Sequence, residues 1–306
     1  MRTQSICTHR IGHFSNAKME SLWLTLRFLR KRHHARYLQR NAYPAMHTKS
    51  MIPIFWINLD RRLDRRTRMT NLLKDLPSTR VTAIEGSSLT NTEVDSLFSS
   101  ERKYQLSKNE AGCILSHREI WRTMLAKDID VACILEDDVE LSPDFPFFMR
   151  STDWLPEAFD VIKVETMMAP VFLSRQRRPA LSRELRRLRS PHFGTAGYIV
   201  SAQGAAKLLQ LTKQPDRALD DLMFQITLEA NSEITVLQML PALCAQDFVI
   251  SDTPSSSDIS NDRQSLRKRD KPKGFKKLRR ELSRPYHQLN HLLRKIMQKY
   301  TTIPYR

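Results

Sequence analysis

The chain has 306 residues, 41% of them hydrophobic, so it is long enough to bury a full core as one sizeable domain with appendages. Its four widely spaced cysteines form no C-x-x-C pair, which indicates neither a zinc ribbon nor a disulfide framework and favours a reduced, cytoplasmic setting. The net charge of +17 suggests nucleic acid or a membrane surface as a partner, depending on where the charges lie.

The basic residues are concentrated in the two ends of the chain. Residues 1–50 carry ten Lys and Arg against one acidic residue, and residues 263–306 carry fifteen against two. We therefore expect a basic N-terminal extension (1–50), a mildly acidic central domain (51–262) and a basic tail (263–306). Three interpretations of the N-terminal extension stay open: a disordered arm, an anchor, or residues that do not belong to the natural protein. Its most apolar stretch, Leu22–Leu29, contains Arg27 and is shorter than the ~20 residues of a spanning helix, so neither a transmembrane helix nor a signal peptide is predicted.

The first strong structural signal is the apolar run Pro53–Leu59, which predicts a strand covered on both faces. An arginine-rich loop follows it, and then a helical pattern that Pro77 closes. Val81–Ile84 is predicted to be a second short strand, with a turn from Glu85 to Ser88. These segments together indicate a strand-loop-helix-strand unit.

A capping box, Ser107 with Glu110, predicts a helix that runs to about Lys127. The buried-type strand Val131–Leu135 comes next, so residues 136–138 are expected at its carboxyl end. Open α/β sheets bind ligands at that edge.

Strands and helices continue to alternate along the rest of the central domain. Strands are predicted at Val161–Val164, Gly194–Val200 and Ile234–Leu237, helices at Gln203–Leu211 and Asp220–Ala230, and a basic mobile loop with a helical part at Arg175–Arg189. This order predicts an α/β fold with a mainly parallel, Rossmann-like central sheet.

Three adjacent acids, Glu136, Asp137 and Asp138, follow the strand that ends at Leu135. Carboxylates beside an apolar wall lose hydration, and a divalent cation offsets that cost. Because Mg²⁺ and Mn²⁺ prefer carboxylate and phosphate oxygens, the cluster suits a metal that carries a nucleotide diphosphate. The alternative is a solvated acidic turn. A second acidic pair, Asp220 and Asp221, could converge on the same face.

Four arginines, Arg61, Arg62, Arg65 and Arg66, follow the first strand. Guanidinium groups favour bidentate contacts with phosphate, so at least one of them is expected to bind phosphate oxygens. The alternative is a solvated face on which they pair with nearby aspartates. His117 lies on the apolar face of its predicted helix and is either a core residue or, with Ser116, part of the border of the ligand pocket.

Several separated motifs, in the same order, resemble glycosyltransferase family 25, the lipopolysaccharide and lipooligosaccharide biosynthesis enzymes related to collagen galactosyltransferases. The resemblance covers about residues 52–260. It is carried by Ile57–Arg62 with Asp64–Arg66 and Met69, Ala83–Gly86, Leu106–Cys113 with Leu115–His117 and Trp121, Ile134–Val139, Thr195–Ser201 with Gly204 and Ala205, and Asp220–Met223.

The resemblance implies a GT-A-like domain at 51–262 that transfers a hexose, often galactose, from a UDP-sugar to a lipopolysaccharide, lipooligosaccharide or related glycan, with inversion. By analogy Asp138, with Glu136, would hold Mn²⁺ or Mg²⁺, and Asp220 or Asp221 would be the general base, unless the pair only caps a helix. Asn109-Glu110 departs from the usual Gly-Glu of the family. Asp220-Asp221 departs from the usual Val-Asp or Leu-Asp, so the choice of base between them stays open. The residues expected to bind the donor are Asn58, Arg61, Arg62, Arg65, Arg66, Glu85, Ser116, His117, Glu136 and Asp137.

The basic tail carries apolar residues at helical spacing from Leu289 to Tyr300, which predicts an amphipathic helix. Such a helix packs on the central domain or lies on an anionic membrane surface, where a lipid-linked acceptor would be found. We expect a cytoplasmic protein, peripheral on the inner face of the inner membrane, and no nucleic-acid partner, because no recognition motif is present. The hypothesis from another class is a basic membrane- or nucleic-acid-binding protein whose acidic cluster is structural.

Overall fold

The computed structural model describes residues 50–98, 106–225, 234–251 and 295–306, and Lys49–Arg306 forms one compact unit. The predicted N-terminal extension lies outside the described residues. The helices are α2 (Leu63–Leu72), α3 (Asn91–Leu97), α4 (Lys108–Ala126), α5 (Phe145–Met149), α6 (Ala202–Leu211), α7 (Leu219–Gln225) and α8 (Asp247–Ile250), with a 3-10 turn, η1, at Gly86–Ser88.

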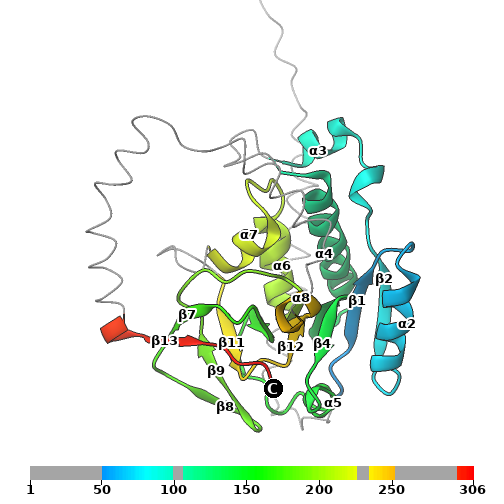
Figure 1. The fold of residues 1–306 in the computed structure, drawn as a ribbon. Helices are drawn as coiled ribbons and strands as arrows, with labels where there is room; N and C mark the ends of the chain where they lie inside the picture. The colour runs from blue at the N-terminus through cyan, green and yellow to red at the C-terminus, as the bar shows by residue number, and fades with distance from the viewer. Residues whose placement is uncertain (1–49, 99–105, 226–233, 252–294) are drawn as a thin grey trace, which may run out of the picture. The chain divides into compact units, whose positions relative to one another are not determined.

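One large sheet, with the order β2-β1-β3-β10-β5-β11-β9-β8, forms the centre of the unit (Figure 1). Its strands are β1 (Ile54–Asn58), β2 (Ser78–Thr82), β3 (Val131–Glu136), β5 (Val161–Lys163), β8 (Arg178–Ala180), β9 (Arg183–Arg187), β10 (Gly197–Ser201) and β11 (Val236–Leu240). Smaller sheets contain β4 (Val139–Leu141), β6 (Glu165–Thr166) and β12 (Cys244–Gln246), and β7 (Pro170–Leu173) with β13 (Lys299–Thr302).

The central sheet is mixed, whereas the sequence predicted a mainly parallel one. β1 pairs in parallel with β2 and β3, and β11 with β5. β10 is antiparallel to both β3 and β5, and β9 is antiparallel to β11 and β8. The inserted β10 therefore starts at the edge of the sheet where β3 and β5 end, so loops before β10 and after β3 share one edge.

Two hydrophobic layers cover the sheet, and the alternation of side chains along each strand divides the residues between them. In β1, Phe55 and Ile57 face the layer that contains α4, α6 and α7, while Ile54 and Trp56 face the layer that contains α2 and α5. A strand buried on both faces has to be apolar throughout, which explains the continuous run in this part of the sequence. The predicted α/β class is confirmed.

Helix α4 begins as the sequence predicted. Ser107 Oγ accepts a hydrogen bond from Glu110 N at 3.1 Å, and Glu110 Oε2 accepts one from Ser107 N at 2.8 Å. Within the helix, Gly112 lies against the segment after β2, because a Cβ at this position would overlap the Ile84 carbonyl oxygen. Ser116 Oγ accepts a hydrogen bond from Ile84 N at 2.8 Å, so α4 fixes the turn that carries Glu85.

Two predictions for basic segments were wrong. Residues 175–189 contain the antiparallel pair β8 and β9 instead of a mobile loop with a helical part. Burial explains the difference: Leu185 is fully buried, and the Arg183 guanidinium pairs with Asp144 and donates to Ala242 O at 2.6 Å. The predicted helix does not reach Tyr300, because Lys299 and Tyr300 belong to the strand β13, which pairs with β7. The first half of that predicted helix, residues 289–294, lies outside the described residues.

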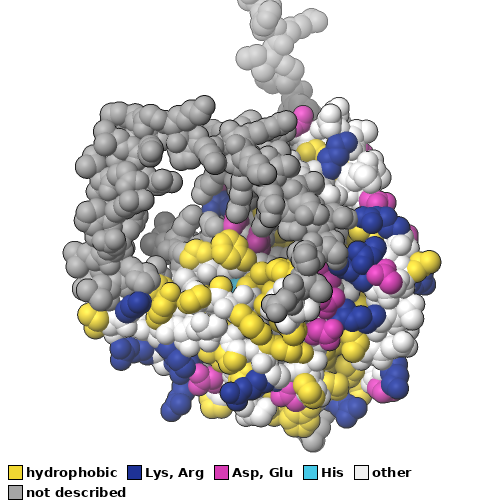
Figure 2. All heavy atoms as spheres, viewed as in Figure 1, with side chains coloured by type: hydrophobic (Ala, Val, Ile, Leu, Met, Phe, Trp, Pro, Cys, Tyr) yellow, Lys and Arg dark blue, Asp and Glu magenta, His cyan; other side chains and the backbone are white. Residues whose placement is uncertain are grey.

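The surface drawn in Figure 2 shows acidic and basic side chains next to one another on the side of the molecule where α2 lies. Arg68 of this helix pairs there with Glu140 at 2.6 Å and with Asp247 at 2.9 Å. Among the described residues, no helix combines the length and the apolar composition that crossing a membrane requires.

Candidate functional site

A pocket opens at the carboxyl ends of β1 and β3, beside the start of α2 and the first half of α4. It is lined by Ile57, Leu59, Arg62, Arg65, Ala83, Ile84, Glu85, Gly86, Asn109, Cys113, Ser116, His117, Glu136, Asp137 and Asp138. This is the edge where the sequence predicted a ligand site. Eight of the predicted site residues line it, namely Arg62, Arg65, Glu85, Ser116, His117, Glu136, Asp137 and Asp138.

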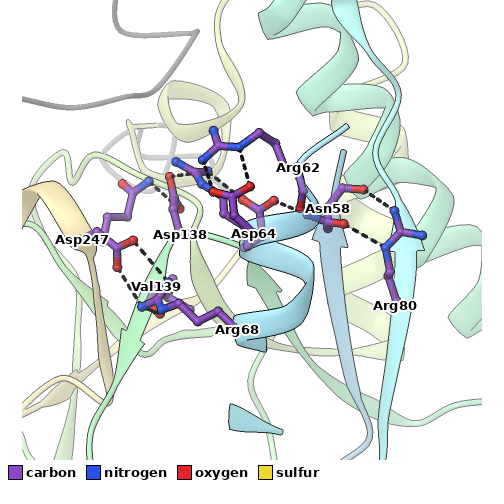
Figure 3. Close-up of polar contacts among 11 residues, drawn as sticks. Asn58, Arg62, Asp64, Arg68, Arg80, Asp138, Val139 and Asp247 are labelled. Carbon is purple, nitrogen blue, oxygen red and sulfur yellow. Dashed lines mark hydrogen bonds and ion pairs between the residues drawn. The ribbon is translucent and has the colours of Figure 1, made fainter. Parts of the chain in front are cut away.

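The three acids at the carboxyl end of β3 have different partners, except that Arg65 contacts both Asp137 and Asp138. Asp137 accepts hydrogen bonds from Asn58 Nδ2 at 2.6 Å and from Arg65 Nη1 at 2.8 Å. Asp138 accepts one from Gln246 Nε2 at 3.2 Å, and its other oxygen lies 3.3 Å from Arg65 Nη1 (Figure 3). Because Asp137 and Asp138 are only 8% and 6% exposed, the alternative of a solvated acidic turn is wrong.

Glu136, the first of the three acids, contacts α4 and the loop before β10. Its Oε1 accepts a hydrogen bond from Thr195 Oγ1 at 2.7 Å and lies 3.6 Å from His117 Nε2. Burial acts to raise the pKa of Glu136, but the adjacent His117 ring, the Thr195 hydroxyl and the Lys163 charge outweigh it, so the pKa is lowered. Glu136 therefore carries its negative charge at neutral pH.

Asp138 shows the opposite effect. Burial raises its pKa to about 7, the charge of Glu136 acts in the same direction, and Arg65 only partly compensates. A buried carboxylate with this pKa is costly to ionise unless a cation approaches it. Since Asp138 and Glu136 also supply the oxygen ligands that Mg²⁺ and Mn²⁺ prefer, the residues present fit a hard divalent cation.

The four arginines near α2 have different roles. Arg62 and Arg65 line the pocket, and Arg62 also pairs with Asp64 at 2.9 Å. Arg61 pairs with Glu85 at 2.7 Å, while Arg66 is exposed and does not line the pocket. Two of the four thus remain candidates for phosphate contact, and the solvated-face reading suits Arg66.

Asn58 is a positioning residue at the end of β1. It does not line the pocket, but its amide nitrogen bonds Asp137 and Arg62 O, and its Oδ1 accepts from Arg80 Nε at 2.9 Å (Figure 3). Asn58 therefore connects the acidic cluster to α2 and to β2.

His117 is fully buried in an aromatic cluster, as the core alternative required, and still reaches the pocket. Its Nδ1 lies 2.8 Å from Tyr198 Oη, which also accepts a hydrogen bond from Trp121 Nε1 at 3.1 Å. The His117 ring stacks on Tyr198 with centroids 5.7 Å apart. These contacts fix the orientation of the imidazole.

The acidic pair at the start of α7 does not line this pocket. Asp220 is buried, and its two oxygens accept hydrogen bonds from Asp221 N at 3.0 Å and from Gly194 N at 3.3 Å. Because Thr195 contacts Glu136, the loop before β10 connects this pair to the pocket. Asp220 is the second residue of α7, and only one of these two contacts is to an amide of that helix, while Asp221 is half-buried.

Sequence reasoning missed several residues that support the site. Gln246 comes from β12, far along the chain, and no local pattern points to it. Arg68 was detectable, because it lies three residues after Arg65 on the same helical face. A further buried pair, Lys163 and Glu165 at 2.7 Å, lies beneath the loop before β10, where burial raises the pKa of Glu165 to about 7 although Lys163 opposes this.

Comparison with known proteins identifies the family of this chain. Residues 51–223 match the model of glycosyltransferase family 25 (LPS biosynthesis protein). The lipooligosaccharide biosynthesis protein lex-1 of Haemophilus influenzae is 35% identical over 193 residues, which are 58% of this chain and 62% of that protein. The lacto-N-neotetraose biosynthesis glycosyltransferase LgtE of Neisseria meningitidis serogroup B is 31% identical over 184 residues, 55% of this chain and 65% of that protein.

The chain thus spans a little over three-fifths of the length of these two relatives. The family match covers more than half of the chain and includes β1, α2, α4, β3, β10 and the start of α7, the elements that form the pocket and its surroundings. This chain therefore belongs to glycosyltransferase family 25.

Proposed function

We propose that this chain transfers a hexose, with galactose as the first candidate, from a UDP-sugar to a lipooligosaccharide or related glycan, with inversion and assistance from a divalent metal. The observation that carries the proposal is the buried Asp138, placed between Arg65 and Glu136 in a pocket at the carboxyl ends of β1 and β3. The family membership and the names of the relatives support the reaction class.

Arg62 and Arg65 are the residues that we assign to the donor diphosphate. Both line the pocket, and their guanidinium groups suit phosphate oxygens. Asp137 acts through Arg65, because its carboxylate accepts a hydrogen bond from that guanidinium at 2.8 Å. The apolar side of the pocket, with Ile57, Leu59 and Ala83, suits a nucleoside base.

Asp138 and Glu136 would hold Mn²⁺ or Mg²⁺, which when bound would stabilise the charge of the departing diphosphate. Inverting transfer also needs a base that accepts the proton of the acceptor hydroxyl. We assign this role to Asp221, because its side chain is half-buried at the start of α7, whereas its neighbour Asp220 is buried and accepts two backbone hydrogen bonds.

The experiment is a titration of the purified full chain with UDP-galactose, UDP-glucose and their N-acetylhexosamine counterparts, with and without Mn²⁺. We expect one UDP-sugar to bind in a Mn²⁺-dependent way and Asp138→Asn to abolish that dependence. Turnover should fall on the order of 10²-fold in this variant, the scale for a lost electrostatic stabiliser. Glu119→Gln, at an exposed position of α4, is the matched control. Absence of binding for every UDP-sugar would overturn the proposal.

A further inference from the structure

Two α4 side chains meet the end of β3 in the pocket. Cys113 and His117 are four residues apart and so share one face of the helix, and Glu136 lies opposite them. One potential ligand atom from each of the three lies within 4.8 Å of the other two. Among the described residues, this is the only group of three or more His, Cys, Asp or Glu side chains that meets this condition.

The distance between His117 and Glu136 suits a shared metal ion. Two ligands ~2.1 Å from a tetrahedral zinc ion are about 3.4 Å apart, and His117 Nε2 lies 3.6 Å from Glu136 Oε1. That spacing is too long for a hydrogen bond. His117 is only 1% exposed, and its Nε2, which points toward Glu136, has no hydrogen-bond partner among the described residues. A buried imidazole nitrogen without a partner is costly, and a bound cation would satisfy it.

The surroundings of His117 resemble the outer shell of a metal site. Metal-bound histidines usually hold their second ring nitrogen in a hydrogen bond that fixes the tautomer and the ring orientation. Here Tyr198 Oη lies 2.8 Å from Nδ1, and Trp121 holds Tyr198 in turn. Thr195 Oγ1 similarly fixes Glu136 Oε1 at 2.7 Å.

From these contacts we propose that Cys113, His117 and Glu136 form a binding site for a thiophilic divalent cation, Zn²⁺ above all. A thiolate, an imidazole and a carboxylate are ligands that zinc accepts, whereas Mn²⁺ and Mg²⁺ favour oxygen alone. The site is distinct from the oxygen pair Asp138 and Glu136, although it shares Glu136. Three protein ligands leave one position for water or another ligand.

Zinc at this site acts as an inhibitor of donor binding. All three ligands line the pocket, together with Asn109 and Ser116. A bound zinc ion therefore occupies space in the pocket and makes Glu136 unavailable to the donor and its metal. This consequence rests on the proposed function, whereas zinc binding itself does not. The remaining described cysteines do not compete, because Cys133 and Cys244 are buried and burial raises the pKa of both thiols.

The test uses the full chain after treatment with a chelator. Zn²⁺ is titrated against a chromophoric competitor, and Co²⁺ is added separately to detect thiolate-to-cobalt charge transfer in the near ultraviolet. We expect one equivalent of either ion to bind, and Cys113→Ser to weaken zinc binding more than about tenfold and to remove the charge-transfer band. Cys7→Ser, which changes a cysteine outside the proposed site, should leave both readouts unchanged.

Circular dichroism and the melting temperature establish that the Cys113→Ser protein is folded, and His117→Gln serves as a second ligand variant if it is not. Equal zinc affinity and an equal cobalt band in wild type and in the folded ligand variant would overturn the site. A further arm measures UDP-sugar binding with and without zinc. Weaker binding in wild type but not in Cys113→Ser supports inhibition, and unchanged binding in wild type overturns it. If no UDP-sugar binds at all, the proposed function fails, while the zinc readouts still decide on the site.

Discussion

The charged form of the Asp138 side chain destabilises the fold, although the proposed metal site needs that charge. It is buried, it lies near the negative charge of Glu136, and its only nearby positive partner, among the contacts described for it, is Arg65, which Asp137 also uses. A sequence selected for stability alone would place a neutral group here. A carboxylate at this position therefore points to a ligand that needs the charge, and this can be tested on the protein without any substrate.

The first prediction concerns stability and pH. The pKa of Asp138 is about 7 in the folded protein and near its ordinary value of 3.8 in the unfolded chain. As pH rises between these values, the unfolded chain loses its proton first, so this group lowers the free energy of unfolding until pH passes 7. Without divalent cations, Asp138→Asn should therefore be more stable than wild type at pH 8, by at least about 1 kcal/mol, and this advantage should shrink toward pH 5.

Urea denaturation at both pH values measures this difference in the free energy of unfolding. The exposed Asp153→Asn is the control and should change it by less than about 0.5 kcal/mol at either pH. An advantage of Asp138→Asn that is equal at pH 5 and pH 8 would contradict the assignment of the raised pKa to Asp138.

The second prediction separates the two acids of α7. Asp220→Asn should lower the melting temperature, because the buried carboxylate accepts two backbone hydrogen bonds, one of them from the loop before β10. Asp221→Asn should reduce turnover on the order of 10²-fold with little change in donor affinity. The measurements are thermal unfolding, donor titration and turnover with a glycan acceptor. Full turnover in Asp221→Asn would contradict this assignment, and the general base would then be Asp220 or another residue.

At the scale of elements, α4 organises one side of the pocket through contacts with its neighbours as well as through the residues it presents. Gly112 allows the helix to approach the backbone of Ile84, and Ser116 bonds Ile84 N. These contacts hold the segment after β2, and Glu85 from that segment then pairs with Arg61. The close approach of α4 thus determines where the rim of the pocket lies.

The third prediction follows from that approach. Gly112→Ala should destabilise the unit by about 2 kcal/mol or more, because the added Cβ meets a backbone carbonyl that cannot rotate away. Helix propensity alone would favour alanine over glycine by up to about 1 kcal/mol. A lower free energy of unfolding in Gly112→Ala would therefore show that packing dominates. Glu119→Ala on the exposed face of the same helix is the control. Denaturant unfolding measures both variants, and a Gly112→Ala protein as stable as wild type would contradict the close packing.

Local signals explain which elements the sequence could predict. The capping box of α4 and the apolar run of β1 are encoded within a few neighbouring residues, and both were predicted correctly. The β8 and β9 pair was mistaken for a loop because its arginines find partners that are distant in the chain, such as Asp144 and Ala242 for Arg183. Gln246 was missed for the same reason, because its partner Asp138 is distant in the chain.

At the scale of the whole molecule, the basic tail consists of two parts with different roles. Its last residues belong to the compact unit: β13 pairs with β7, Ile303 is fully buried, and Ala242 N donates to Pro304 O at 2.8 Å. Residues 263–294, which lie outside the described residues, carry most of the tail's charge, and Ile296 and Met297 shortly after them are exposed. We propose that this part binds anionic lipid near a lipid-linked acceptor.

The fourth prediction is that the full chain sediments with anionic vesicles at low salt and is released as salt rises toward about 1 M, because screening removes contacts of about 1 kcal/mol per basic residue. Replacing the basic residues of 267–280 by glutamine should abolish binding without unfolding the protein. Deleting 263–306 is a poor test, since it also removes β13 and Ile303. Vesicle binding that persists in the glutamine variant would place the contact elsewhere.

The antiparallel insertion of β10 has a consequence for how enzymes with this topology can diversify. Because β10 enters the sheet at the edge where β3 and β5 leave it, residues 190–196 lie between the carboxylate of Glu136 and the acids of α7 while the strands on both sides stay fixed. We propose that a change in this short stretch alters which sugar or acceptor fits and leaves the proposed nucleotide contacts of Arg62 and Arg65 untouched. Grafting residues 190–196 from relatives with other specificities is thus a compact route to exchanging substrates on one scaffold.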